Sequence, residues 1–262
     1  MRLALAFALV AGCGSTHAAA TVDADAGGHV LAHPDAGPRE DGGADADVGR
    51  SFCAHRTPRA AFCDDFDDLG TLGARWDVLE PSPPGVASTD LTSFVSAPAS
   101  LGVLTRRLGM GELGSILLRK TIKGTASRVV LAFDHYGDAV QKDGTLAIAT
   151  LDLSLDHLLT LYLRDDDPSA PGPTLTELPP LGTFVEKNPL PVPPAGAWTH
   201  IVIDADAAHG RVTVTYAGAV VLDVGIARGA ALDPTIRVGA LVSGAAAPYA
   251  VRFDDVTVDL VP

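Results

Sequence analysis

Three groups of adjacent aspartates are the residues of this chain best suited to acid–base or metal chemistry. They are Asp64-Asp65, Asp165-Asp166-Asp167 and Asp254-Asp255. A retaining glycosidase needs two carboxylates about 5–5.5 Å apart. Adjacent aspartates on a strand point to opposite faces of the sheet, and aspartates in a loop are not held at a fixed separation. None of these three groups therefore supplies such a pair. No G-x-S-x-G nucleophile elbow occurs either. The sequence therefore predicts a protein that is not an enzyme.

The elements that would position such residues are almost all strands. Apolar and polar residues alternate with a period of two through 198–223, and turns at His209-Gly210 and Ala217-Gly218 divide this stretch into three predicted strands. No long segment has the 3.6-residue period of an amphipathic helix. Further strands are predicted at 61–67, 99–106, 116–122 and 128–136, and a hairpin about Asp156 at 144–155 and 157–164.

The stretch 198–223 carries a resemblance to a known fold. A Trp, an alternating strand, a G-x-V-x-V-x-Y strand and a turn of small residues follow one another. This order resembles the concanavalin A-like lectin/glucanase superfamily, and within it the laminin-G-like modules. The resemblance implies an all-β jelly-roll sandwich of two antiparallel sheets over 51–262, with a polysaccharide as ligand. The superfamily's hydrolases carry a Glu-x-Asp-x-Glu type of strand, which is absent from this sequence.

The C-terminal stretch 249–260 extends the resemblance and predicts a cation. F-D-D-V-T-V-D resembles the closing strand of these jelly rolls, which pairs with the first strand, here 63–68. The apolar phase slips at Asp254-Asp255, which predicts a β-bulge. Because two charges about 4 Å apart repel by about 4 kcal/mol at an effective dielectric near 20, we expect a structural calcium. Its predicted ligands are Asp64, Asp65 and Asp254; ion pairing with Arg75 or Arg252, or solvation, is the alternative.

A polar surface is the predicted ligand site. We expect it on the outward face of one sheet, below a proline-rich loop over 165–197, and a solvated face without a ligand is the alternative. Its candidate residues are Asp134, Tyr136, Tyr162 and Arg164. Exposed aromatic rings commonly hold sugars, but the two tryptophans, Trp76 and Trp198, are predicted to lie in the core.

The N-terminus predicts export and a lipid anchor. Residues 1–12 have the basic start, short apolar run and small-residue end of a signal peptide, and L-V-A-G-C resembles a bacterial lipobox that ends at Cys13. Cys13 is therefore the predicted lipidation site, with an ordinary secretory signal as the alternative. Residues 13–50, rich in Ala, Gly and Asp, are predicted to be a disordered tether that cannot bury a core.

Cysteines and charge bound the remaining possibilities. Cys53 and Cys63 are predicted to form a disulfide, as the oxidising compartment of an exported protein favours; a metal site would need a second pair of ligands. Lys plus Arg number 19 against 32 Asp plus Glu, which argues against a nucleic-acid partner. The expected partners are a bacterial membrane through the anchor, and a polysaccharide or other envelope proteins. A structural envelope protein and, less favoured, a glycan-active enzyme are the alternative functions.

Overall fold

The computed structural model describes most of residues 51–262. The exceptions are 69–71, 73, 83–84, 110–111, 139–143, 166–171, 188–189 and 244–247. The predicted signal peptide 1–12, Cys13 and the tether 13–50 lie outside the described residues. Within the described part of the chain, no helix is long and apolar enough to cross a membrane.

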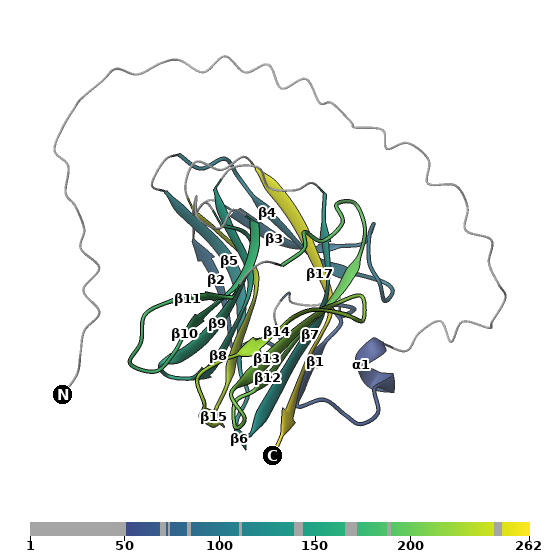
Figure 1. Ribbon diagram of the computed structural model, residues 1–262. Coiled ribbons are helices and arrows are strands. Elements are labelled where there is room, and N and C mark those ends of the chain that lie inside the picture. The colour runs from purple at the N-terminus through teal and green to yellow at the C-terminus, as the bar shows by residue number, and fades with distance from the viewer. Residues whose placement is uncertain are drawn as a thin grey trace, which may run out of the picture. The chain divides into compact units, whose positions relative to one another are not determined.

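Two large antiparallel sheets pack face to face, which confirms the predicted all-β sandwich (Figure 1). Among the described residues, an eight-stranded sheet contains β14 (Ala219–Gly225), β13 (Arg211–Tyr216), β12 (Thr199–Asp206), β7 (Arg128–Gly137), β17 (Tyr249–Val261), β4 (Ser100–Thr105) and β3 (Gly85–Asp90) in this order, with β1 (Phe62–Asp64) beside β17. A seven-stranded sheet contains β11 (Val185–Lys187), β10 (Gly172–Leu178), β9 (His157–Asp165), β8 (Thr145–Ser154), β16 (Thr235–Ser243), β5 (Leu113–Thr121) and β2 (Val78–Ser82). A small sheet of β6 (Thr125–Ala126) and β15 (Ala231–Leu232) and the short helix α1 (Phe52–His55) complete the described elements.

Alternation along the strands builds the core between the two sheets. On β7, Leu131, Phe133 and His135 are buried and face inward, whereas Tyr136 between His135 and Gly137 is only partly buried. Phe133 packs against Phe253 of β17 with ring centroids 5.9 Å apart. Full burial of one such large apolar side chain stabilises the fold by about 1.5–3 kcal/mol, so the two inner faces hold the sandwich together.

Two predicted local motifs are confirmed. β12, β13 and β14 pair in sequence as an antiparallel meander, with Ile203 opposite Val214 and Val214 opposite Leu222. β8 and β9 form the predicted hairpin, in which Ser154 pairs with His157. In both motifs a tight turn joins strands that are consecutive in the sequence. The turn and the period of two together therefore define which strands pair.

The closing strand β17 changes partners at the predicted bulge. Asp254 lies opposite Asp134 of β7, and the next paired residue is Thr257 opposite Ala132, so β17 carries one extra residue. Asp255 within the bulge has φ +49°. On its other side, β17 pairs with β4 up to Phe253 and with β1 from Val256 onward. The first strand therefore pairs with the last, as the resemblance implied, although it is shorter than predicted.

The sequence predicted one continuous proline-rich loop over 165–197, and this prediction is wrong. The stretch contains β10, which pairs with β9, and β11 at the edge of the sheet. The register of β10 shifts between Gly172 and Thr174, so Pro173, which has no N–H to donate, lies at an irregular position. The alternating segment T-L-T-E-L that follows then pairs normally.

The N-terminal segment is tied to the sandwich by a disulfide and polar contacts. Cys53 at α1 and Cys63 on β1 form the predicted disulfide, with Cα atoms 5.7 Å apart. Arg56 forms an ion pair with Asp259 near the end of β17. The disulfide and the ion pair hold this segment against β1 and β17.

Candidate functional site

The four predicted ligand-binding residues do not share one surface. Asp134 and Tyr136 lie on β7 of the eight-stranded sheet, whereas Tyr162 and Arg164 lie on β9 of the seven-stranded sheet. The outer faces of packed sheets point in opposite directions, so the prediction of a single site from these four residues is wrong. A period of two separates the faces of a strand, but it does not tell which sheet the strand joins.

The outer face of the seven-stranded sheet carries a polar row that runs across five strands. Cross-strand partners align two arginines with three threonines at the same level of the sheet. The threonine side chains are buried, and the accessible part of the row is formed by the guanidinium groups. From β5 to β10, the row is Arg119, Arg237, Thr150, Thr160 and Thr176.

Carboxylates neutralise both arginines of this row. Arg119 Nη1 lies 2.9 Å from Glu80 Oε1, and Arg237 Nη1 lies 2.7 Å from Asp152 Oδ2. Arg237 Nε is also 4.0 Å from Glu80 Oε2. Burial raises the pKa of Asp152, and the adjacent Arg237 opposes that shift. The four groups are fixed in place, partly exposed and without net charge, which suits hydrogen bonding to a neutral polar ligand.

A pocket of about 560 Å³ adjoins these ion pairs. Hydroxyl groups, a second ion pair and two exposed leucines surround it. Thr121 and Thr235 hydroxyls lie 3.0 Å apart, and Lys123 Nζ lies 3.0 Å from Asp233 Oδ2. The described lining residues are Thr121, Lys123, Asp152, Ser154, Leu155, Leu232, Asp233, Thr235 and Arg237. Sequence reasoning missed this site because each residue looks like an ordinary solvated position until the strands assemble.

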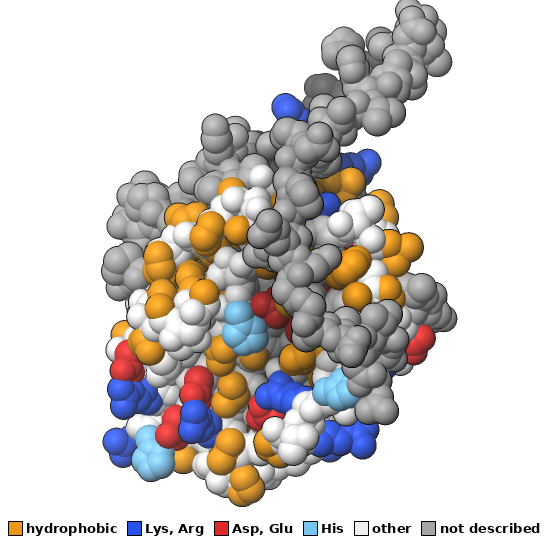
Figure 2. Space-filling model, turned by 90° about the vertical axis from the view of Figure 1, so that its right-hand side faces the viewer, with side chains coloured by type: hydrophobic (Ala, Val, Ile, Leu, Met, Phe, Trp, Pro, Cys, Tyr) orange, Lys and Arg blue, Asp and Glu red, His pale blue; other side chains and the backbone are white. Residues whose placement is uncertain are grey.

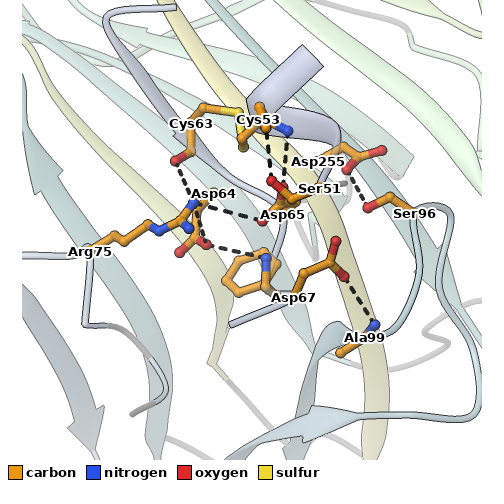
Figure 3. A network of polar contacts seen from close by, with 12 residues as sticks. Ser51, Cys53, Cys63, Asp64, Asp65, Asp67, Arg75, Ser96, Ala99 and Asp255 are labelled. Atoms are coloured by element: carbon orange, nitrogen blue, oxygen red, sulfur yellow. Dashed lines mark hydrogen bonds and ion pairs between the residues drawn. A yellow bond between two sulfur atoms is a disulfide. The ribbon is translucent and has the colours of Figure 1, made fainter. Parts of the chain in front are cut away.

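The predicted calcium region is a cluster of aspartates at the junction of β1 and β17, called here the aspartate seam (Asp64, Asp65, Asp67, Asp254 and Asp255). Figure 3 shows Asp64, Asp65, Asp67 and Asp255 of this seam. Asp64 accepts a hydrogen bond of 2.6 Å from Trp76 Nε1, and Asp65 accepts one of 2.9 Å from the Cys53 N–H. The seam thus joins the disulfide-linked segment, the buried Trp76 and the closing strand.

Backbone and hydroxyl donors hold the two aspartates of the bulge. Asp254 Oδ2 accepts hydrogen bonds of 2.7 Å from Val95 N and 3.0 Å from Ser96 N, and the Ser96 hydroxyl donates to Asp255 at 2.7 Å. Burial, followed by the nearby Asp255 charge, raises the pKa of Asp254 to about 8. Burial also raises the pKa of Asp255 to about 7, although the Ser96 hydroxyl opposes it. The desolvated carboxylates therefore favour protons.

The predicted calcium ligands are only partly free to bind a cation. Among the described residues, no three or more His, Cys, Asp or Glu side chains are grouped so that they could hold a metal ion. Asp64 and Asp254 already accept hydrogen bonds, whereas the buried Oδ1 of Asp65 and Oδ2 of Asp67 have no hydrogen-bond partner. Arg75 Nη1 lies 3.7 Å from Asp65 Oδ1. Asp65 thus fits a cation best, and calcium stays a prediction.

The two tryptophans occupy different environments. Trp76 is buried against Phe62 and Phe66, as predicted. The prediction that Trp198 lies in the core is wrong, because this residue is only partly buried and packs against Tyr136, with ring centroids 5.5 Å apart. Trp198 directly precedes β12, where the next residue, Thr199, is buried and faces inward. The alternation therefore turns Trp198 to the outer face.

Comparisons with known proteins identify the fold. No family model and no curated protein matches the chain. The endo-β-1,4-glucuronan lyase of the fungus Trichoderma reesei has a TM-score of 0.58 at 15% identity, over 77% of this chain and 96% of its own. The cellulose-induced protein Cip1 has a TM-score of 0.56 at 15% identity, over 75% and 96%. The carbohydrate esterase of bacteriophage phi24B has 0.50 at 10% identity, over 78% and 99%. The chain therefore shares the jelly-roll β-sandwich fold of these structures.

Proposed function

We propose that the protein is a polysaccharide-binding module and that the outer face of the seven-stranded sheet holds the ligand. The pocket beside the Arg237–Asp152 ion pair carries this proposal, because it combines hydroxyls, fixed charge pairs and exposed leucines in one concavity. Sugar hydroxyls pair with such groups, and the C–H faces of the rings contact apolar side chains. The carbohydrate-related names of the similar structures support the ligand class, although a fold does not by itself define a function.

Binding without catalysis is the proposal that this face supports best. A lyase must neutralise the carboxylate of its uronate substrate and supply a base, whereas Arg119 and Arg237 are already paired with Glu80 and Asp152. The described residues that line the pocket include no histidine or tyrosine. The Ser154 hydroxyl donates to Asp156 at 3.2 Å and not to an imidazole that could activate it.

The decisive experiment compares two arginine substitutions in polysaccharide binding. Arg237→Met removes the charge beside the pocket and keeps an apolar stem of similar length, and we expect it to weaken retention by immobilised polysaccharide about tenfold. The matched control is Arg211→Met, which breaks an exposed ion pair with Asp223 on the other sheet. Equal retention of both variants would contradict the assignment of this face. Release of an unsaturated or hydrolysed product by the wild type would replace binding with enzymatic activity.

We further propose that the module is exported and tethered to a bacterial membrane through Cys13, with 13–50 as the spacer. The lipobox-like L-V-A-G-C supports this. Fractionation of cells that express wild type or Cys13→Ser tests it: the wild type should enter the membrane fraction with an acyl mass, and the variant should not. A correctly anchored protein that binds no polysaccharide would favour the alternative of a structural envelope protein.

A further inference from the structure

The outer face of the eight-stranded sheet carries an aromatic pair in a fixed polar frame. Tyr136 lies directly opposite Arg252 in the β7–β17 pairing, and Trp198 packs on the other side of Tyr136. The Arg252 Cζ atom lies 5.2 Å from the centre of the Tyr136 ring. Trp198, Tyr136 and Arg252 therefore form one row across three neighbouring segments of chain.

Two carboxylates fix this arginine. Arg252 Nε lies 2.6 Å from Asp90 Oδ2, and Arg252 Nη1 lies 2.8 Å from Asp138 Oδ1. A guanidinium held from two sides cannot swing away from the tyrosine ring without losing both contacts. The aromatic pair is thus held in one arrangement before any ligand arrives, which lowers the entropy cost of binding.

A histidine and an aspartate form the next row of the same face. His200 lies opposite Asp134, two residues along the strands from the aromatic row, a separation of about 7 Å. His200 Nδ1 is 3.2 Å from Asp134 Oδ1. The His200 side chain is 46% exposed and that of Asp134 only 11%, so the imidazole is the accessible member. The hydrogen bond to Asp134 raises the pKa of His200, which favours an imidazolium that donates hydrogen bonds.

Several aromatic residues elsewhere lie in the core. Phe133, Phe253, Trp76, Tyr216 and Tyr249 are all buried. Phe94 and Phe184 are exposed as well, so the observation that marks this pair is the contact between its two rings on an outer face. Figure 2 shows the side of the molecule on which α1, β1 and β17 lie in Figure 1, with acidic, basic and histidine side chains intermixed.

We infer that Trp198, Tyr136, His200 and the flanking Asp134 and Asp138 form a second binding site, for a neutral sugar ring, on the sheet opposite the pocket. The ring stacks on the partly exposed aromatic surface, and its hydroxyls pair with the imidazole and carboxylates one row away. Asp90 and Asp138 pair with the Arg252 guanidinium and Asp134 pairs with His200, so the carboxylates outnumber the cationic groups, which disfavours a uronate. The choice of a sugar as the ligand rests on the proposed function.

Two sites on opposite sheets give the module a property that one site cannot provide. A monomer that holds one polysaccharide chain on each face bridges the two chains, and the tether would then connect the bridged chains to the membrane. Mixing the protein with a long neutral glucan should therefore produce soluble aggregates that scatter light, and removal of either site should abolish the scattering.

Tryptophan fluorescence tests the second site directly. The full chain is titrated with cellohexaose, laminarihexaose and an oligoglucuronate. We expect a neutral oligosaccharide to change the emission of wild type and of Trp76→Phe, in which Trp198 is the remaining tryptophan, and to leave the emission of Trp198→Phe unchanged. Because Trp76 donates to buried Asp64, circular dichroism must first confirm that Trp76→Phe is folded; if it is not, the comparison of wild type with Trp198→Phe decides.

Calorimetry separates failure of the second site from failure of the proposed function. Wild type should bind the neutral glucan at two classes of site, Trp198→Ala and Arg237→Met at one class each, and Arg211→Met at both. Two classes of site in Trp198→Ala, or no emission change with either neutral oligosaccharide, would overturn the second site alone. A wild type that binds no polysaccharide by either method would overturn both proposals.

Discussion

The aspartate seam and the outer face of the seven-stranded sheet both gather carboxylates, but they compensate the charge differently. On the outer face, Glu80 and Asp152 each have a guanidinium within 3 Å and contact with solvent. In the seam, Asp254 is fully buried and accepts hydrogen bonds from backbone N–H groups. The Arg75 guanidinium lies 3.9 Å from Asp64 and 3.7 Å from Asp65. Burial and then the neighbouring Asp255 charge raise the pKa of Asp254, and the backbone donors only partly oppose them. The seam should therefore respond strongly to substitution, cations and pH, and the outer face weakly.

The largest effect should come from removal of the acceptor at the bulge. Asp254→Ala leaves the partly buried N–H groups of Val95 and Ser96 without their partner, and an unpaired group costs up to about 1–3 kcal/mol according to its burial. We expect the free energy of unfolding in urea at pH 7 to fall by roughly 2–4 kcal/mol. Asp254→Asn is the matched control, because it keeps an acceptor and is uncharged, like a carboxyl with a pKa of about 8. An Asn variant as unstable as the Ala variant would show that the charge, not the acceptor, holds the loop.

Calcium should have the next largest effect, through the predicted site in the aspartate seam. A ligand at a hundredfold excess over its dissociation constant stabilises the folded state by about 2.7 kcal/mol. The melting temperature in millimolar calcium should therefore exceed that in chelator by several degrees. Asp65→Asn removes the carboxylate whose buried Oδ1 has no hydrogen-bond partner, and it should abolish the difference. Equal midpoints for wild type in both buffers would leave protons, backbone donors and Arg75 as the compensation.

His135 gives the core a pH dependence opposite to that of the seam. Burial lowers the pKa of His135 to about 3, and its Nε2 has no hydrogen-bond partner. A depressed folded pKa gives stability that is present above the unfolded value of 6.5 and is lost as pH falls toward 3. The stability lost between pH 7 and pH 5 should be about 2 kcal/mol from this group.

His135→Leu should remove this acid sensitivity and leave the opposite pH dependence of the seam unchanged. The raised pKa values of Asp254 and Asp255 have the reverse sign: their stabilisation is present below about pH 4 and is lost as pH rises toward 8. The difference in unfolding free energy between wild type and His135→Leu, measured from pH 4 to pH 8, isolates the imidazole. A difference that does not change with pH would mean that His135 titrates like an exposed histidine.

Local patterns made parts of the fold predictable. The meander at 198–223, the hairpin about Asp156 and the bulge at Asp254-Asp255 each follow from a period of two, or its interruption, over a few residues. Cys53 and Cys63 were the remaining pair once Cys13 was assigned to the lipobox. Such features depend on near neighbours in the chain, which a single sequence displays.

The candidate sites could not be predicted because they depend on contacts between distant strands. Tyr136 and Tyr162 have the same alternating context, yet their strands belong to different sheets. Trp198 directly precedes β12, and its neighbour Thr199 faces inward. Because side chains alternate along a strand, Trp198 faces outward, and a shift of one residue would have placed it in the core. The pocket combines Thr121, Asp152 and Arg237 from β5, β8 and β16, and no motif joins them.

The smallest effect on stability should come from Arg237→Met on the outer face of the seven-stranded sheet. This substitution also separates an effect on binding from an effect on folding. Arg237→Met removes one partner of a partly exposed ion pair, and such pairs contribute about 0–1 kcal/mol. Asp152 keeps contact with solvent, so its charge remains hydrated after the substitution. Arg211→Met, at a more exposed pair, should leave the urea midpoint unchanged. If Arg237→Met instead destabilises the domain as much as Asp254→Ala, the guanidinium has a structural role, and the loss of polysaccharide binding would no longer identify a ligand contact.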